Sequence, residues 1–451
     1  MRIEEVLSFN LGSEAGQFKI MPAKLGTGRR GFVAFYAACY DVDVHYSMFV
    51  PPNDMLHAIC FTDDGTILWK REMGIWPSAA LYCFTLVDMD GDGKDEIYVV
   101  DNSDPEHPLW IEAFVLERMD VLTGTVTGTW QWPNDGGTDR SMWYFRNHVF
   151  AGYVHGEPVL VTAQGTYADM HFQAYGRDMK RKWRLDIPKD ASGARGSHSF
   201  PIVDIDGDDV DEVLWGERCI SLRDGHELFC IDRDSWRGHS DMCQPVWDKV
   251  GKRWLVYCNR ESDEQQGPRI GMYDSTGKVL WSDVEWGHIH KGWVGRIGEH
   301  GELIANGMRI TGQKKDAIGR YYTGITEFVY EAISGEPIHL SFSLFDTAPV
   351  DMDGDGLAEI LRGVAGGDTV LLDRQGRKLF HMGGKVAMNS KIIDAPGEQV
   401  MCYYPNGDIK LFWDADAVDS SEAKRRYASP VYQRNQYARN IENNICMLGA
   451  I

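Results

Sequence analysis

A short phrase recurs along the chain, and it limits the possible folds more than any other feature of the sequence. It has an apolar strand, a turn built on Asp or Ser and Gly, and a second apolar stretch that often contains Trp or Phe, as in CFTDDGTILWK from Cys60. Further copies begin at Asp120, Ala174, Ser221, Met272, Tyr330 and Leu371, and a shorter one lies near Tyr403. The copies stand roughly 30 to 60 residues apart, which brackets the length of a four-stranded propeller blade. The repeat therefore predicts an all-β fold, a single β-propeller.

The number and placement of the copies predict how the ring is built. Seven clear copies and one weak copy favour eight blades, with the N-terminal strand closing the ring against the last blade. Seven blades follow if the weak copy is only a tail. We assign residues 1–414 to the propeller, and we expect residues 415–451, which lack the phrase, to pack across one face. Two separate β domains are less favoured, because the spacing never breaks at a linker.

Composition and charge narrow the class of protein and of partner. Of the 451 residues 43% are hydrophobic, which suits a globular protein with a large core. A net charge of -21 argues against nucleic acid or an anionic membrane as partner, since either favours a basic face. An acidic substrate remains compatible with this charge, because it could bind in a local basic cleft.

The N-terminus and the cysteines indicate a compartment. The first residues, MRIEEVLSFN, carry two early acids and no apolar core, so we predict no signal peptide, and no later stretch is apolar enough to span a membrane. Nine cysteines without CxxC spacing suggest buried thiols in a reducing compartment. We expect a cytoplasmic protein, or a secreted one if a leader has been lost.

Three nearly identical acidic stretches predict calcium sites with a structural role. They are DMDGDGKDE, DIDGDDVDE and DMDGDGLAE, and Asp209 replaces a glycine at position 6 of the second. Acids at relative positions 1, 3, 5 and 9 and a backbone carbonyl at 7 supply the hard oxygen ligands that calcium prefers. We expect each ion between the first and second strands of a blade, the alternative being solvated acidic turns without an ion. The predicted ligands are Asp88, Asp90, Asp92 and Glu96; Asp204, Asp206, Asp208 and Glu212; and Asp351, Asp353, Asp355 and Glu359.

Histidines recur near the start of the predicted innermost strands. They are His148, His198, His239 and the pair His288 and His290. In a propeller these strand starts converge on one end of the central channel, where substrates usually bind. The imidazoles suit zinc, with Cys243 as a further candidate ligand, or they could act as bases and charge-neutralising groups. We expect both, with His239, His288 and His290 in the subset that holds zinc or calcium.

A tyrosine and an arginine lie near these histidines. Tyr167 ends a second strand beside His148, and Arg184 lies one hairpin further along the chain. Such a group suits β-elimination from a uronic acid, which needs a neutralised carboxylate, a base for the C5 proton and an acid for the leaving oxygen. A glycoside hydrolase would instead need two carboxylates about 5 to 9 Å apart. The acids of this chain fall mostly in the calcium loops, which favours elimination.

The segments VTAQGTY and KWRLD, followed by SHSFPIVDIDGDDVDEVLWG and RGHSDM, resemble the propeller polysaccharide lyases. These are the rhamnogalacturonan lyases of family 11 and the related ulvan and rhamnose–glucuronate lyases. The resemblance implies Tyr167 as acid and base and Arg184 as partner of the substrate carboxylate, with His148 and His198 in the active site. Arg177, Arg181 or Arg146 could take the role of this arginine instead. The residues expected to bind substrate are Arg146, Asn147, Arg237, Lys291 and Trp293.

The sequence thus predicts a lyase that cleaves a rhamnose–uronic acid linkage in an acidic rhamnose-containing oligosaccharide or polysaccharide. The substrate could be of the rhamnogalacturonan, ulvan or rhamnose–glucuronate type. Because no secretion signal is predicted, imported oligosaccharides are favoured over intact external polymers. The alternative is a non-catalytic propeller, stabilised by calcium, that binds glycan or protein.

Overall fold

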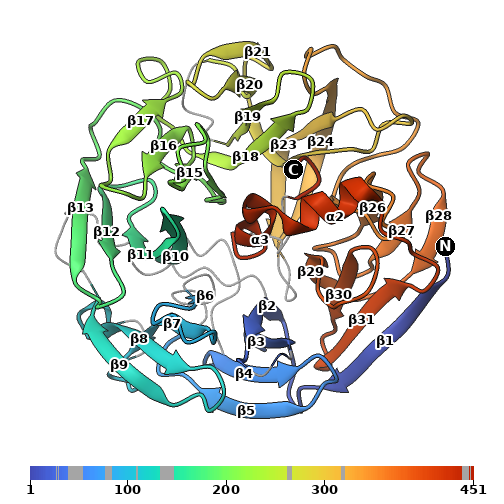
Figure 1. The fold of residues 1–451 in the computed structure, drawn as a ribbon. Coiled ribbons are helices and arrows are strands. Elements are labelled where there is room, and N and C mark those ends of the chain that lie inside the picture. The colour runs from blue at the N-terminus through green and yellow to red at the C-terminus, as the bar shows by residue number, and fades with distance from the viewer. Residues whose placement is uncertain are drawn as a thin grey trace.

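The strands of the chain follow one another as antiparallel sheets around a ring (Figure 1). The computed structural model describes residues 1–26, 28, 30–38, 54–76, 84–107, 110–132, 147–261, 267–315, 320–438, 446 and 448–451. Within these ranges there are eight sheets, seven with four strands and one with three. The same ranges contain no helix with the length and apolar character of a membrane span. The predicted all-β class is confirmed.

Each sheet is named here by its innermost strand, and the strands run outward from it. The β2 sheet has β2 (Gln17–Lys24), β3 (Arg30–Ala37), β4 (His57–Thr62) and β5 (Ile67–Glu72), and the β6 sheet has β6 (Phe84–Val87), β7 (Glu96–Asn102), β8 (Phe114–Asp120) and β9 (Val126–Gln131). The β10 sheet has β10 (Asn147–Val154), β11 (Glu157–Gln164), β12 (Met170–Tyr175) and β13 (Arg181–Ile187), and the β14 sheet has β14 (Ile202–Val203), β15 (Glu212–Trp215), β16 (Arg218–Ser221) and β17 (Glu227–Cys230).

The second half of the chain continues the same order. The β18 sheet has β18 (Ser240–Asp248), β19 (Arg253–Arg260), β20 (Ile270–Asp274) and β21 (Val279–Asp283), and the β22 sheet has β22 (His288–Gly295), β23 (Ile304–Lys315) and β24 (Arg320–Glu331). The β25 sheet has β25 (Thr347–Val350), β26 (Glu359–Arg362), β27 (Val370–Leu372) and β28 (Lys378–His381). The β29 sheet has β29 (Lys385–Ser390), β30 (Gln399–Tyr403), β31 (Asp408–Asp414) and, outermost, β1 (Ile3–Asn10).

Burial decreases from the centre of the ring to its rim. The inner strand β18 is almost wholly buried, whereas β21, the outer strand of the same sheet, is largely exposed. Inner strands of neighbouring sheets contact one another, for example β6 with β10 and β18 with β22. Because both faces of an inner strand are covered, its sequence shows no alternation of polar and apolar residues.

The repeated phrase locks each sheet to the next. Each of the seven clear copies begins in the third strand of its sheet and continues through the turn that follows this strand. Where a copy contains a tryptophan such as Trp69, Trp183 or Trp281, the indole contacts the turn of the following copy. The indole of Trp69 donates a 2.8 Å hydrogen bond to the carbonyl of Val121 and lies so close to Gly124 that a Cβ there would be 2.6 Å from the ring. Gly124 also has φ +67, a conformation that favours glycine. The same hydrogen bond joins Trp183 to Leu222 and Trp281 to Ala332.

The two ends of the chain close the ring. Strand β1 pairs antiparallel with β31, so the last sheet takes its outermost strand from the N-terminus, as the sequence predicts. The weak copy of the phrase lies between β30 and β31, the second and third strands of this sheet, rather than beyond a third strand.

Two short helices cover one end of the ring, in front of its centre in Figure 1. Helix α2 (Ser421–Ala428) is capped by Ser420 and helix α3 (Pro430–Asn435) by Ser429. Asn435 accepts a hydrogen bond from the backbone N–H of Ile202 and donates one to its carbonyl, which fixes α3 to β14. The inner strands end on this side, which we call the helix end, and begin on the opposite side, which we call the histidine end.

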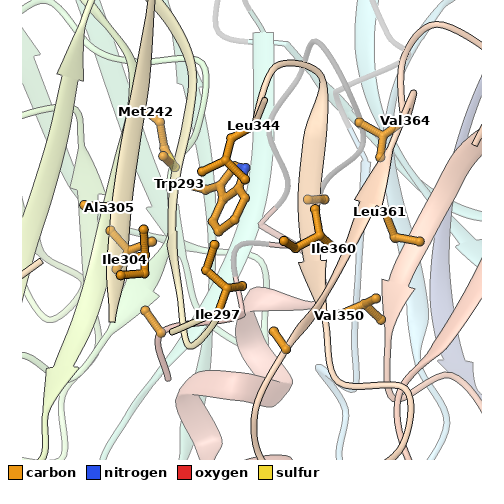
Figure 2. Close-up of a cluster of buried hydrophobic side chains, with 14 of the residues drawn as sticks. Met242, Trp293, Ile297, Ile304, Ala305, Leu344, Val350, Ile360, Leu361 and Val364 are labelled. Atoms are coloured by element: carbon orange, nitrogen blue, oxygen red, sulfur yellow. The ribbon is translucent and has the colours of Figure 1, made fainter. Parts of the chain in front are cut away.

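The largest apolar cluster lies between the β18, β22 and β25 sheets. Figure 2 shows Trp293 of β22 packed among aliphatic side chains of this cluster, between Met242 and Ile360. Trp293 is 1% exposed, and its indole N–H donates to Thr347 Oγ1 at 3.3 Å. The prediction that Trp293 binds substrate is therefore wrong, because its strand turns this side chain between two sheets and away from the channel.

Candidate functional site

Four of the predicted histidines meet around one carboxylate at the histidine end. His198 precedes β14, His239 precedes β18, and His288 and His290 begin β22. Their Nε2 atoms lie 2.9 to 3.3 Å from the carboxylate oxygens of Glu261, which follows β19. We call these four histidines, Glu261 and Asp241 the histidine cluster. Residues from three sheets thus converge as the strand starts predict.

Asp241 is the second carboxylate of the cluster. Its Oδ1 lies 3.5 Å from Nδ1 of His198 and 3.8 Å from Nδ1 of His290. Its Oδ2 accepts a 2.7 Å hydrogen bond from the backbone N–H of Lys291. Asp241 therefore holds the two buried imidazoles from the side opposite Glu261.

Both carboxylates stay ionised although they are buried. Burial raises the pKa of the Glu261 carboxyl, but the imidazoles of His198, His290 and His239 outweigh it and hold this pKa well below its usual value. The pKa of Asp241 is lowered in the same way, against the effect of burial, by its contacts with His198 and His290. The cluster thus carries two buried negative charges that stabilise protonated imidazoles or a bound cation.

The donor atoms of the cluster suit a transition-type metal. Nitrogen atoms of His198 and His239 with Glu261, and of His288 and His290 with Glu261, lie within 4.8 Å of one another. Imidazole nitrogens with one carboxylate are typical zinc ligands, whereas calcium takes oxygen ligands. The donors fit zinc better than calcium. Cys243 is not among them, because its sulfur lies 3.1 Å from that of Cys258 in the core.

Tyr167 contacts the cluster through its hydroxyl. The oxygen lies 2.6 Å from Nε2 of His198, and the ring packs edge-on against His239 with 4.3 Å between centroids. Tyr167 lies in the connection between β11 and β12 and has φ +83, a strained conformation for a bulky residue. Strain of this kind costs about 1–3 kcal/mol and gathers at functional sites. The structure therefore supports a chemical role for Tyr167.

The arginine beside Tyr167 is Arg195 and not Arg184. Arg195 donates to the Tyr167 carbonyl at 3.2 Å and accepts from the Tyr167 N–H at 3.1 Å. Burial and then the charge of nearby Arg237 lower the pKa of Arg195. Its Nε is buried without a hydrogen-bond partner. The carboxylates of Asp169 and Asp190 act on the pKa of Arg195 in the opposite direction, so the Arg195 guanidinium lies beside Tyr167 among charges of both signs.

The structure places the other candidate arginines elsewhere. Arg184 lies on the outer strand β13 and donates to Asp186 at 2.7 Å, so its predicted contact with the substrate carboxylate is wrong. Arg177 donates to the Met89 carbonyl at the helix end, and Arg181 to Gln173. Arg146 lies outside the described residues. Arg237, which was expected to bind substrate, is exposed beside His239.

His148 and Asn147 are buried in contacts with neighbouring side chains. The His148 ring lies edge-on to Phe200 and Trp215, with 4.9 and 5.2 Å between centroids, and it is 1% exposed. The Asn147 side chain is wholly buried and accepts hydrogen bonds from Trp132 and Gln164. The expected substrate contact of Asn147 is therefore wrong, whereas the catalytic role expected of His148 stays a prediction, since His198 of the cluster is about as deeply buried.

Lys291 lies at the edge of the cluster, and its expected contact with substrate stays a prediction. Its backbone has φ +52, and its ammonium group lies 3.4 Å from Asp346 and 5.5 Å from the ring centre of Tyr322. Tyr322, on β24, also packs against His290 with 5.3 Å between ring centroids. The β23–β24 hairpin thus borders the cluster with an aromatic ring.

The sequence prediction missed Asp241, Glu261, Arg195 and Tyr322. Asp241 follows His239 by two residues, and Arg195 precedes His198 by three, so both lie in segments already singled out. Glu261 ends a second strand, where nothing in the sequence marks it. Tyr322 comes from a hairpin whose path over the cluster depends on the length of β23 and β24.

The three acidic stretches lie at the helix end, each between the first and second strands of its sheet, as predicted. In the first, the position-1 carboxylate of Asp88 accepts from Gly91 and Gly93, and Glu96 at position 9 accepts from Met89. The position-6 residues Gly93, Asp209 and Gly356 share a positive φ of 85, 63 and 95. The three turns therefore share one conformation, and Asp209 adopts it without being glycine.

The position-9 glutamates of these turns lie among neighbouring acids, and in each turn one basic side chain pairs with the position-5 aspartate: Lys94 with Asp92, Arg223 with Asp208 and Arg374 with Asp355. Burial, followed by the neighbouring aspartates, raises the pKa of Glu96 to about 7 and that of Glu212 to about 8. Crowded, buried carboxylate oxygens of this kind fit a calcium ion. The third turn has a second basic side chain, since Arg426 of α2 lies 2.9 Å from Asp351 and 3.1 Å from Glu398.

The sequence of this chain is similar to those of known rhamnogalacturonan lyases. Residues 132–320 match the sequence model described as rhamnogalacturonan lyase family 11, C-terminal domain. The rhamnogalacturonan exolyase YesX of Bacillus subtilis (strain 168) is 27% identical over 272 residues, which are 52% of this chain and 43% of that protein. The rhamnogalacturonan endolyase YesW of the same strain is 27% identical over 277 residues, 52% of this chain and 42% of that protein. The chain therefore spans less than half the length of these relatives in the alignments.

Solved structures show the same fold. The exotype rhamnogalacturonan lyase YesX aligns with a TM-score of 0.77 at 18% identity, over 98% of this chain and 81% of that one. The Bacillus licheniformis rhamnogalacturonan lyase PL11 aligns with a TM-score of 0.74 at 18% identity, over the same shares. The resemblance to rhamnogalacturonan lyase family 11 that the sequence predicts is confirmed.

Proposed function

We propose that the protein is a polysaccharide lyase that cleaves a rhamnose–uronic acid linkage of rhamnogalacturonan by β-elimination. We assign the eight sheets to eight blades of a propeller, with calcium in the acidic turns. The observation that carries the proposal is the 2.6 Å contact of Tyr167 with His198, next to Arg195, whose guanidinium donates to the Tyr167 carbonyl at 3.2 Å. The match to the family 11 sequence model over residues 132–320 supports the same reaction.

The residues supply the three groups that elimination requires. Arg195 and Arg237 neutralise the uronate carboxylate, which makes the proton on C5 more acidic. The anion of Tyr167, favoured by nearby positive charge, or His198 removes this proton. As the C4–C5 double bond forms, the C4–O bond breaks and the leaving oxygen takes a proton from the Tyr167 hydroxyl.

A metal ion could be held by Glu261 with His239, His288 and His290. When bound, it would supply a fixed positive charge beside the substrate carboxylate. His198 then remains in contact with Tyr167 and keeps its hydroxyl in position. Without metal, Glu261 and Asp241 orient His198 through the contacts described above.

The decisive experiment measures unsaturated product by ultraviolet absorbance on rhamnogalacturonan, ulvan and rhamnose–glucuronate oligosaccharides. Turnover on rhamnogalacturonan supports the proposal, and turnover only on one of the other two corrects the substrate. Oligosaccharides and polymer are compared, so that the assay shows whether short or intact chains are cleaved. Glycan binding without unsaturated product from any of them favours the non-catalytic alternative.

Two variants test the assigned residues. Tyr167→Phe removes one oxygen and should lower kcat by a factor on the order of 10² to 10⁴ while the fold survives. The matched control is Tyr175→Phe in the same sheet. The Tyr175 hydroxyl donates a 3.1 Å hydrogen bond to Gln173, which is not a residue of the histidine cluster. Near-native turnover of a folded Tyr167→Phe protein would mean that Tyr167 has a packing role and no catalytic role.

Arginine variants separate the two candidate carboxylate partners. Arg195→Ala should weaken both substrate binding and turnover, because it removes positive charge facing the carboxylate. Arg184→Ala should leave both within about twofold, since Arg184 pairs with Asp186 on the outer strand. The reverse order of effects would return the role to Arg184.

A further inference from the structure

An exposed tryptophan lies at the rim of the histidine end. Trp286 is 58% exposed, more than any other tryptophan of the described residues, and it lies in the connection from β21 to β22. It precedes His288 of the cluster by two residues. A single exposed apolar side chain is common on protein surfaces, so what makes Trp286 a candidate binding residue is its place beside the cluster and the arginine that stacks on it.

An arginine fixes this indole on one face. The guanidinium carbon of Arg309 on β23 lies 4.0 Å from the Trp286 ring centre and 5.2 Å from that of Phe328. The stem of Arg309 crosses Gly287, where a Cβ would lie 2.4 Å from Arg309 Cδ, and Gly287 has φ +104. A glycine at this position therefore allows the close stacking of Arg309 under Trp286.

Among the described residues, Arg309 has aromatic neighbours instead of a carboxylate partner. In the described part of the chain no Asp or Glu forms an ion pair with it, and its Nε is buried without a hydrogen-bond partner. Some arginines of the protein pair with carboxylates, such as Arg218 with Glu227 and Arg260 with Glu217. Arg309 instead lies against two aromatic rings, which leaves its charge available to an acidic ligand.

We propose that Trp286 and Arg309 form a subsite that binds a further sugar of an acidic polysaccharide next to the cleavage site. The proposal rests on the proposed lyase function for the identity of the polymer. The open face of the indole covers the apolar face of the sugar ring, which removes apolar surface of both from water. Arg309 holds the indole in place and attracts the uronate carboxylates of the chain.

The subsite lies on the path that a bound polymer would follow. Trp286 belongs to the same chain segment as His288 and His290, and Arg309 is paired in the sheet with Ile289 between them. A polysaccharide bound with one uronate at Tyr167 would cross the cluster to reach Trp286. Trp286 is therefore a binding residue and Arg309 a positioning residue.

The first test compares Trp286→Ala with Trp286→Phe on rhamnogalacturonan. Loss of one stacking contact should raise KM about 3- to 10-fold and leave kcat within twofold, and phenylalanine should restore most of the affinity. The matched control is Trp130→Ala, since Arg118 lies 5.7 Å from the Trp130 ring centre on the outer strands β8 and β9. Equal KM values for Trp286→Ala and the parent would overturn the proposal.

A binding test separates this inference from the lyase proposal. In the Tyr167→Phe protein, retardation on gels containing rhamnogalacturonan, polygalacturonate or a neutral galactan measures binding without cleavage. We expect retardation by the acidic polymers that weakens in the Trp286→Ala and Arg309→Met variants. If the parent binds an acidic polymer through Trp286 but forms no unsaturated product, only the lyase function fails. Retardation that is unchanged by both substitutions, or absent with both acidic polymers, would overturn the subsite.

Discussion

Replacing Arg426 by methionine tests how the C-terminal helices hold the ring. Arg426 of α2 is buried and donates to Asp351 at 2.9 Å and to Glu398 at 3.1 Å. Burial already raises the pKa of Asp351 to about 7, although Arg426 acts in the opposite direction. The substitution keeps most of the side-chain volume and leaves two neighbouring buried carboxyl groups without a cation.

The structure sets the size of the effect. Removing one partner of a buried ion pair costs about 3–5 kcal/mol, because the remaining charge is neither solvated nor paired. For a chain of 451 residues the unfolding entropy is about 1 kcal/mol/K. The Arg426→Met protein should therefore melt about 3–5 °C below the parent.

The assay is differential scanning calorimetry in excess chelator, so that bound calcium does not differ between the proteins. Arg425→Met is the matched control, because Arg425 is the exposed neighbour on the same helix and should change the melting temperature by less than about 1 °C. A shift below 1 °C for Arg426→Met would refute the reasoning, since it would mean that the two carboxyl groups are accommodated without their cation.

Three further predictions concern the metals and the core. Excess chelator should lower the melting temperature of the parent, because calcium bound only by the folded state stabilises it by mass action, and an unchanged melting curve counts against calcium in the acidic turns. His239→Ala should lose about one metal ion per chain in elemental analysis, and full retention in single alanine variants of His198, His239, His288 and His290 would leave these histidines as bases or packing residues. Trp293→Ala should cost about 3–5 kcal/mol and lower the melting temperature by a similar number of degrees, whereas an unchanged melting temperature would contradict its place in the core.

The sequence predicts the ring because the repeated phrase is itself the contact between neighbouring sheets. A tryptophan such as Trp69 needs a glycine turn such as that at Gly124 beside it, so the spacing of the phrase follows the spacing of the sheets. The convergence of histidines was predictable for a similar reason. Strand starts that repeat at one register share one end of the ring, which places His198 near His239 without further information.

The errors at the site come from directions that the sequence does not encode. Inner strands are covered on both faces, so no alternation tells which side chains point into the channel, and Asn147 and Trp293 were misassigned for this reason. Arg184 lies in the expected hairpin, but it lies on β13, the outermost strand of the sheet, and therefore away from the central channel. Arg195 reaches Tyr167 because the connection from β13 to β14 crosses the histidine end. The sequence of this connection does not recur in the other sheets, so its path could not be predicted by aligning the copies.

The pairing of β1 with β31 has a consequence during synthesis. Arg2 and Asp414, which bond through the Arg2 backbone, are 412 residues apart in the chain. At the usual 5–20 residues per second the ribosome leaves β1 without its partner for about 20–80 s. During this time an unpaired strand is an edge on which other chains could assemble. Glu4 and Glu5 give it adjacent negative charges, and most of its side chains remain exposed even in the finished ring. The strand that waits longest is thus protected by charge against premature pairing.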